Sequence, residues 1–139
     1  MADGDALIET ARRAMEHAHA PYSRFRVGAA LETLDGRIFT GCNVENASYG
    51  GTICAERVAM GTAVAAGARE FRRIAIASDA AEPVAPCGLC RQFLAEFGVK
   101  LEVMSVGASG RRQSWILGDL LPVAFTGADI EGRHRGGSA

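Results

Sequence analysis

The chain has 139 residues, 48% of them hydrophobic, which is enough for one soluble domain to bury a core without a disulfide framework. Fifteen basic and sixteen acidic side chains leave a formal net charge of −1. This balance argues against a protein that coats nucleic acid, because such proteins usually carry a basic excess.

Apolar spacing and turn residues predict alternating helices and strands along the chain. A helical pattern over 5–19 ends before Pro21, and strands over 27–33 and 37–42 flank the hairpin signal Asp35-Gly36. After a polar, glycine-rich loop over 43–52, the expected elements are a helix over 54–68, a strand over 73–78, a helix over 88–97, and strands over 101–106 and 114–117. Because strands alternate with helices in the second half, we expect one α/β domain over residues 1–126 with some parallel strand pairing. Residues 127–139 are polar and glycine-rich, and we expect a frayed C-terminal tail there.

The sequence also predicts the compartment and the state of the cysteines. The uncharged run over 58–68 is shorter than the roughly 20 apolar residues of a membrane span. Charged residues interrupt the place where the apolar core of a signal peptide would lie. We therefore expect a cytoplasmic protein without a membrane partner, in which thiols stay reduced. Its four cysteines then point to a metal or to catalysis before they point to disulfides.

Two short segments carry the chemistry: Cys54-Ala55-Glu56 and Pro86-Cys87-Gly88-Leu89-Cys90. Cys87 and Cys90 are three residues apart at a helix start, so both sulfurs can face one ion, and Cys54 opens another helix and could supply a third sulfur. Three thiolates suit a tetrahedral Zn²⁺ and leave a fourth position for water. The metal would lower the pKa of that water from about 15.7 toward 7.

Glu56 supplies the proton carrier that a hydrolytic site of this kind still needs. One geometric difficulty is that residues two apart on a helix point to nearly opposite sides. Glu56 can therefore share a pocket with Cys54 only if Cys54 lies at the helix start or the Glu56 side chain bends back. Arg57 follows Cys54 by three residues, so we expect it on the same helix face, where it can donate to a ligand sulfur.

These motifs resemble the small, homotetrameric cytidine deaminases. A His or Cys two residues before Glu, followed by Pro-Cys-x-x-Cys, is the signature of the zinc-dependent nucleobase and nucleoside deaminases. The resemblance extends over about residues 6–125 and includes the segments 21–30, 41–49 and 120–125. It implies a three-layer α/β/α fold with a mixed five-stranded sheet, assembled as a homotetramer with sites shared between subunits.

The resemblance implies a role for each residue of the two motifs. Cys54, Cys87 and Cys90 would bind one Zn²⁺ per subunit. Glu56 would shuttle the proton and recognise the ring N3 of the substrate. The backbone N–H of Ala55 would meet the pyrimidine O2.

The resemblance also implies how the nucleoside is held. Asn43 and Glu45 would bind the 3′-hydroxyl of the ribose, and Phe25 would form a wall against the ring. Tyr49 and Phe125 would reach the site from neighbouring subunits. Because the Glu45 carboxylate would repel a 3′-phosphate, we expect a free nucleoside and no nucleic acid as substrate.

The implied reaction is the hydrolysis of cytidine or 2′-deoxycytidine to uridine or 2′-deoxyuridine and ammonia, as in pyrimidine salvage. Relatives that act on cytosine-bearing nucleoside antibiotics share the zinc motif, so such an antibiotic is an alternative substrate. Cys42 is expected in the core, but as a fourth ligand it would close a structural zinc site and make the chain a non-catalytic module. Cys87 and Cys90 at a helix start could also form a thioredoxin-like redox pair, which would leave Cys54 and Glu56 unexplained.

Overall fold

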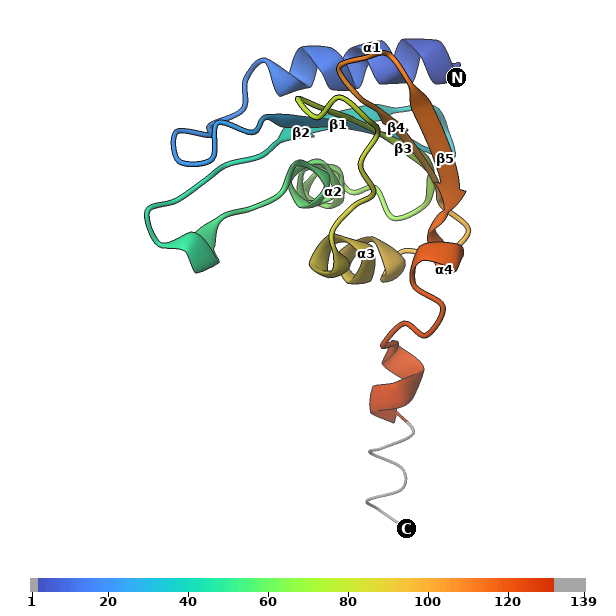
Figure 1. Ribbon diagram of the computed structural model, residues 1–139. Helices are drawn as coiled ribbons and strands as arrows, with labels where there is room; N and C mark the ends of the chain where they lie inside the picture. Colours follow the sequence, from blue (N-terminus) through green and yellow to red (C-terminus); the bar gives the residue numbers. More distant parts are fainter. Residues whose placement is uncertain (1–2, 132–139) are drawn as a thin grey trace.

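The computed structural model describes residues 3–131 (Figure 1). Its elements in chain order are α1 (Gly4–Met15), β1 (Val27–Thr33), β2 (Ile38–Cys42), the 3-10 helix η1 (Tyr49–Gly51), α2 (Ala55–Ala65), β3 (Phe71–Ser78), α3 (Gly88–Ala95), β4 (Glu102–Val106), β5 (Arg112–Ile116) and α4 (Leu117–Leu120). This order agrees with the predicted succession of helices and strands and adds η1 and α4 to it. None of the described helices combines the length and the apolar character that crossing a membrane requires.

The strands form one five-stranded sheet in the order β2-β1-β3-β4-β5. β3 and β4 pair in parallel, and every other neighbouring pair is antiparallel. Parallel neighbours need a crossover connection, which α3 supplies between β3 and β4. In Figure 1, α1 covers one face of the sheet, and α2 and α3 cover the other. The prediction of a three-layer α/β/α fold with a mixed five-stranded sheet is thus confirmed.

Alternation of side chains along the strands divides the core into two layers. On β1, Ala29 and Leu31 join the cluster that packs against α2 and α3, whereas Ala30 joins the cluster under α1. The α1 helix contributes Leu7 and Ala11 to that second cluster, and both are fully buried.

Two glycines set the distance between a helix and the sheet. A Cβ on Gly28 of β1 would lie 2.1 Å from the carbonyl oxygen of Ala11 in α1. A Cβ on Gly41 of β2 would lie 2.4 Å from the backbone nitrogen of Ala59 and 2.5 Å from the carbonyl oxygen of Ala55, both in α2. The backbone of α2 therefore lies directly against β2, and it can approach this closely because Gly41 has no Cβ.

The helix predicted over 5–19 ends early, at Met15. The chain then extends, and His19 forms a backbone bridge with Val44. Its N–H donates to the Asn43 carbonyl at 2.9 Å, and its own carbonyl accepts from the Glu45 N–H at 2.8 Å. These partners lie far away in the sequence, so local apolar spacing could not reveal that they end the helix.

Other boundaries differ at the ends of elements. The α2 helix begins at Ala55 with Cys54 as its N-cap, and β5 spans Arg112–Ile116 where we expected 114–117. The predicted tail is also partly wrong, because residues 127–131 are helical. The rest of that tail, 132–139, lies outside the described residues.

Candidate active site

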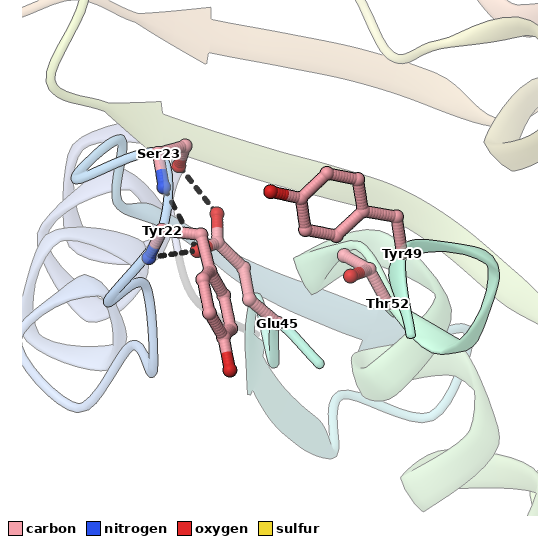
Figure 2. Close-up of a pocket in the computed structure, with 5 residues that line it drawn as sticks. All are labelled: Tyr22, Ser23, Glu45, Tyr49 and Thr52. Carbon is pink, nitrogen blue, oxygen red and sulfur yellow. Dashed lines mark hydrogen bonds between the residues drawn. The ribbon is translucent and has the colours of Figure 1, made fainter. Parts of the chain in front are cut away.

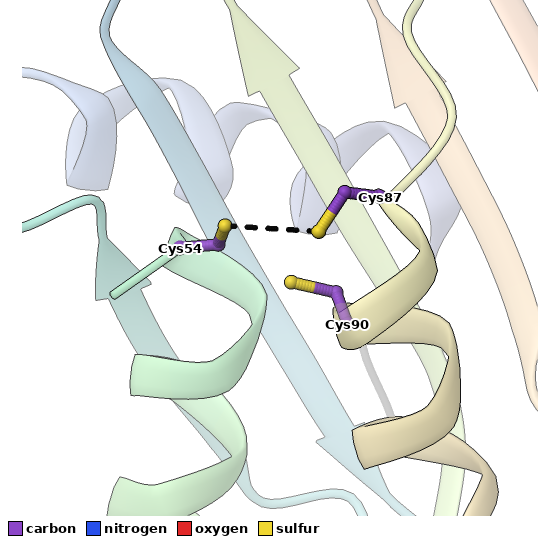
Figure 3. Close-up of side chains that lie close together, drawn as sticks. All are labelled: Cys54, Cys87 and Cys90. Atoms are coloured by element: carbon purple, nitrogen blue, oxygen red, sulfur yellow. Dashed lines mark hydrogen bonds between the residues drawn. The ribbon is translucent and has the colours of Figure 1, made fainter. Parts of the chain in front are cut away.

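The sulfurs of Cys54, Cys87 and Cys90 meet between the N-terminal ends of α2 and α3 (Figure 3). All three lie within 4.8 Å of one another, and Cys54 Sγ is 3.9 Å from Cys87 Sγ. With zinc–sulfur bonds of about 2.3 Å, a tetrahedral site places its sulfurs about 3.8 Å apart. The cluster therefore fits a zinc ion, and the predicted grouping of these three cysteines is what the fold produces.

Helix ends position the sulfurs. Cys54 and Cys87 are the N-cap residues of α2 and α3, and neither uses its side chain to cap its own helix. Their sulfurs are thus left for a ligand, and the partial positive charge of two helix N-termini lies beside them. Cys90 follows one turn later in α3 and is fully buried.

The geometric difficulty with Glu56 is resolved by the conformation of Cys54. Cys54 has an extended backbone, with φ −73° and ψ 154°, so it lies outside the helix and the opposition of residues two apart does not apply. Glu56 is only 5% exposed. Burial raises its pKa to about 7, which suits a group that must both accept and return a proton near neutral pH.

Arg57 contacts the cluster as predicted. Its Nη2 lies 3.8 Å from Cys54 Sγ and donates to the Thr52 carbonyl at 3.3 Å. A hydrogen bond from the Cys90 thiol, with a smaller contribution from Arg57, lowers the pKa of Cys54 to about 5. The same pairing with Cys54, together with burial, raises the pKa of Cys90. The neighbours of Cys54 thus favour its thiolate, the form of cysteine that binds a metal.

A cavity of about 370 Å³ opens beside the sulfurs and joins segments that are distant in the sequence. Its lining comes from the 23–27 segment, the loop after β2, the start of α2, β3 and the loop before α3. The lining residues are Ser23, Phe25, Val27, Asn43, Glu45, Thr52, Cys54, Ala55, Glu56, Ile76, Val84, Ala85 and Cys87. Most of the residues predicted to bind or convert a substrate are therefore found in one cavity, with Cys90 in the sulfur cluster beside it.

Asn43 and Glu45 reach the cavity through contacts with the 22–27 segment. The Asn43 amide accepts from the Val27 N–H at 2.9 Å and donates to the Phe25 carbonyl at 2.8 Å. Glu45 Oε1 accepts from the Tyr22 N–H at 2.9 Å and from the Ser23 N–H at 3.1 Å. Glu45 Oε2 accepts from the Ser23 hydroxyl. These bonds hold both side chains in place against the wall that contains Phe25.

Tyr49 and Phe125 do not line this cavity within one chain. Tyr49 is 76% exposed and borders a second cavity of about 340 Å³, together with Tyr22, Ser23, Glu45 and Thr52 (Figure 2). Its ring meets that of Tyr22 edge to face, with centroids 6.0 Å apart. Phe125 is half exposed. The Gln92 side chain of α3 holds the Phe125 backbone, donating to its carbonyl at 2.7 Å and accepting from its N–H at 3.2 Å.

Sequence reasoning missed two polar residues of the cavity, Ser23 and Thr52. Ser23 lies in the 21–30 segment that carried the resemblance, so its position offered a signal, but nothing local reveals that its hydroxyl faces Glu45. Arg26, in the same segment, points elsewhere: its guanidinium forms two hydrogen bonds to the Asp79 carboxylate, at 3.0 and 3.1 Å.

Cys42 does not belong to the sulfur cluster. Among residues 3–131, the group able to hold a metal consists of Cys54, Cys87 and Cys90 alone. Cys42 is partly buried in β2, and this burial raises its pKa. A closed structural site with four cysteines is therefore excluded, since the fourth ligand is missing. The redox pair is also disfavoured, because Cys54 and Glu56 stand beside Cys87 and Cys90 in an arrangement that suits a metal.

Known proteins are similar to this chain in both sequence and fold. Residues 1–106 match the family model described as the cytidine and deoxycytidylate deaminase zinc-binding region. A cytidine deaminase from Halalkalibacterium halodurans is 46% identical over 129 residues, covering 92% of this chain and 98% of the relative. A probable cytidine deaminase from Dictyostelium discoideum is 48% identical over 127 residues, covering 91% of this chain and 86% of the relative.

Solved structures agree with these matches. The crystal structure of cytidine deaminase from Burkholderia pseudomallei has a TM-score of 0.87 and 53% identity, covering 89% of this chain and all of that chain. The structure of the Mycobacterium tuberculosis cytidine deaminase has a TM-score of 0.79 and 40% identity, over 90% of this chain and 98% of that one. With its sulfur cluster, its buried glutamate and these matches, the chain belongs to the zinc-binding cytidine and deoxycytidylate deaminase family.

Proposed function

We propose that this protein is a zinc-dependent hydrolase that converts cytidine and 2′-deoxycytidine to uridine and 2′-deoxyuridine with release of ammonia. The observation that carries the proposal is the meeting of three sulfurs with a buried glutamate at one cavity of nucleoside size. A structural metal site would need no carboxylate at this place. Membership of the deaminase family supports the same reaction.

Cys54, Cys87 and Cys90 hold the zinc in this proposal, one ion per chain. When bound, the metal supplies a water of low pKa next to the substrate. With zinc bound, Glu56 would take one proton from that water and deliver it to ring N3, as the water oxygen becomes bonded to C4. Glu56 would then carry the second proton from the C4 oxygen to the exocyclic nitrogen. The bond from C4 to this nitrogen breaks, the nitrogen leaves as ammonia, and the C4 carbonyl of the product remains. A carboxyl group with a pKa of about 7 is fitted to both halves of this transfer.

The walls of the cavity select the substrate. Phe25 packs against the pyrimidine ring, and the N–H of Ala55, in the first turn of α2 where it lacks an intrahelical acceptor, binds the ring O2. Asn43 and Glu45 bind the sugar hydroxyl. An ionised Glu45 repels a 3′-phosphate, so free nucleosides are accepted and polynucleotides are not.

We further propose a homotetramer in the cytoplasm that serves pyrimidine salvage. Tyr49 and Phe125 are exposed and lie outside the sulfur-lined cavity of their own chain, which supports a role at a neighbouring subunit. Leu89 and Phe93 of α3 also expose apolar surface, which supports a contact between copies of the chain. The catalytic domain spans residues 1–126 in this proposal.

Ultraviolet monitoring of the purified protein with cytidine tests the function. We expect conversion to uridine, about one zinc per chain, loss of conversion when a chelator strips the metal, and recovery when zinc returns. Absence of turnover by zinc-loaded protein with either nucleoside would refute the proposal. A short cytosine-containing single strand serves as the second substrate, and its efficient deamination would refute the restriction to nucleosides.

A further inference from the structure

Ser23 borders two cavities and forms hydrogen bonds with both Glu45 and Phe25. It lines the sulfur-lined cavity and also the neighbouring cavity between Tyr22 and Tyr49 (Figure 2). Its hydroxyl bonds on two sides, donating to Glu45 Oε2 and accepting from the Phe25 N–H at 3.0 Å. A serine hydroxyl has one proton, so that proton is committed to the Glu45 carboxylate.

The Glu45 carboxylate depends on the Ser23 residue for most of its donors. Ser23 supplies a backbone N–H to one oxygen at 3.1 Å and its hydroxyl to the other. The third donor is the N–H of Tyr22, at 2.9 Å. These bonds, the Ser23 hydroxyl first among them, hold the pKa of Glu45 below its usual value. The carboxylate is therefore ionised at neutral pH and acts only as an acceptor toward a sugar hydroxyl.

The hydrogen bond from the Phe25 N–H to the Ser23 hydroxyl spans Arg24, whose backbone conformation is unusual. Arg24, between the two residues, has a φ of +57°, the left-handed region that non-glycine residues rarely adopt. A serine hydroxyl that accepts from the N–H two residues later stabilises such a turn. Ser23 thus stabilises the turn at Arg24 and, through it, the backbone position of Phe25, the next residue.

We infer that Ser23 is a positioning residue that holds the sugar-binding carboxylate of Glu45 in register with the ring wall at Phe25. The inference rests on the proposed function. Without the hydroxyl, Glu45 keeps its charge but loses the donor that orients one of its oxygens. Oε1 keeps its two backbone donors, but Oε2 no longer has a donor that fixes its position toward the sugar hydroxyl. The ring wall at Phe25 also loses its hydrogen-bonded link to Glu45 through Ser23.

The test compares Ser23→Ala with the wild-type enzyme on two substrates, cytidine and 3′-deoxycytidine. Removing a hydrogen bond to a charged group corresponds to a loss of about 10- to 100-fold in kcat/KM for cytidine. We expect that loss to appear mainly as a higher KM, with zinc content unchanged. With 3′-deoxycytidine, which lacks the hydroxyl that Glu45 binds, we expect a loss of at most about threefold. Ser23→Thr keeps the hydroxyl and should restore kcat/KM for cytidine to within about threefold of wild type.

Ser114→Ala is the matched control, because Ser114 is an exposed serine of β5 that lines neither cavity. If Ser23→Ala fails to fold, Ser23→Cys retains a weaker donor of similar size and should give an intermediate loss with the same dependence on substrate. Equal losses on both substrates, or no loss at all, would overturn the inference while leaving the proposed function in place. A zinc-loaded wild-type protein that converts no cytidine would refute the proposed function and the inference with it.

Discussion

Gly41 offers a direct test of how the fold places the catalytic turn. In Gly41→Ala, the new Cβ would lie 2.4 Å from the Ala59 nitrogen and 2.5 Å from the Ala55 carbonyl oxygen. Ordinary contacts of a Cβ begin near 3.4 Å, so the first turns of α2 must move away from β2 by about 1 Å. Backbone atoms line the contact, so no side chain can rotate to relieve it.

The displacement has consequences for both stability and catalysis. Overpacking of this kind typically costs about 1–3 kcal/mol of the free energy of unfolding. Because Cys54 and Glu56 move with the start of α2 while Cys87 stays with α3, the sulfur cluster opens as well. A misplacement of about 1 Å at reacting groups can lower the rate by about 100-fold. We therefore expect lower stability, weaker zinc retention and a fall in kcat/KM of about that size.

Denaturant unfolding, zinc analysis and steady-state kinetics with cytidine measure these three effects. Gly61→Ala is the control within the same helix, because a Cβ there meets nothing within 4 Å. An alanine in place of an exposed helical glycine should stabilise the chain by about 0.5–1 kcal/mol and leave kcat/KM unchanged. A Gly41→Ala protein with wild-type stability and zinc content would show that the close contact between α2 and β2 does not set the site.

Three further residues carry predictions of their own. Glu56→Gln should keep zinc and fold while losing nearly all turnover, and a variant that stays active would remove Glu56 from the mechanism. In the zinc-free protein, burial raises the pKa of Glu56 to about 7. From about pH 4.5 to 7, the native state therefore keeps a proton on Glu56 that the unfolded state has lost. The free energy of unfolding of the wild type should then fall, relative to that of Glu56→Gln, as the pH rises through this range. We expect this fall to be about 3 kcal/mol. Denaturant unfolding of both proteins across this pH range tests it, and a difference in unfolding free energy that does not change with pH would contradict the burial of a titrating group. Arg57→Ala should retain the fold but weaken catalysis, since it removes the donor 3.8 Å from the Cys54 sulfur; activity equal to wild type at equal zinc content would refute this role. Cys42→Ser should bind zinc as wild type does, and zinc analysis that shows a loss would make Cys42 a ligand after all.

The succession of helices and strands and the three-cysteine motif could be predicted from the sequence because both depend on local patterns, whereas the three-layer arrangement was implied by the family resemblance. Strand β1 was predicted at its observed bounds, since its apolar run stops at a turn signal. The spacing of Cys87 and Cys90 at a helix start brings their sulfurs to one side for the same local reason, the period of the helix. Helix ends were predicted less well: α1 ends at Met15 because His19 pairs with Val44, which no pattern within the first helix announces.

Only the tertiary structure decided how the separate motifs become one site. Glu56 shares the cavity with Cys54 because Cys54 is an extended N-cap, and α2 lies where it does because Gly41 lets its backbone rest on β2. The tie from Ser23 to Glu45 spans 22 positions and exists only once the 22–27 segment and the loop after β2 lie side by side. The physical reason is the same in each case. Helical period and turn preference act between near neighbours, whereas close packing and hydrogen bonds between distant segments arise only when the whole sheet has formed.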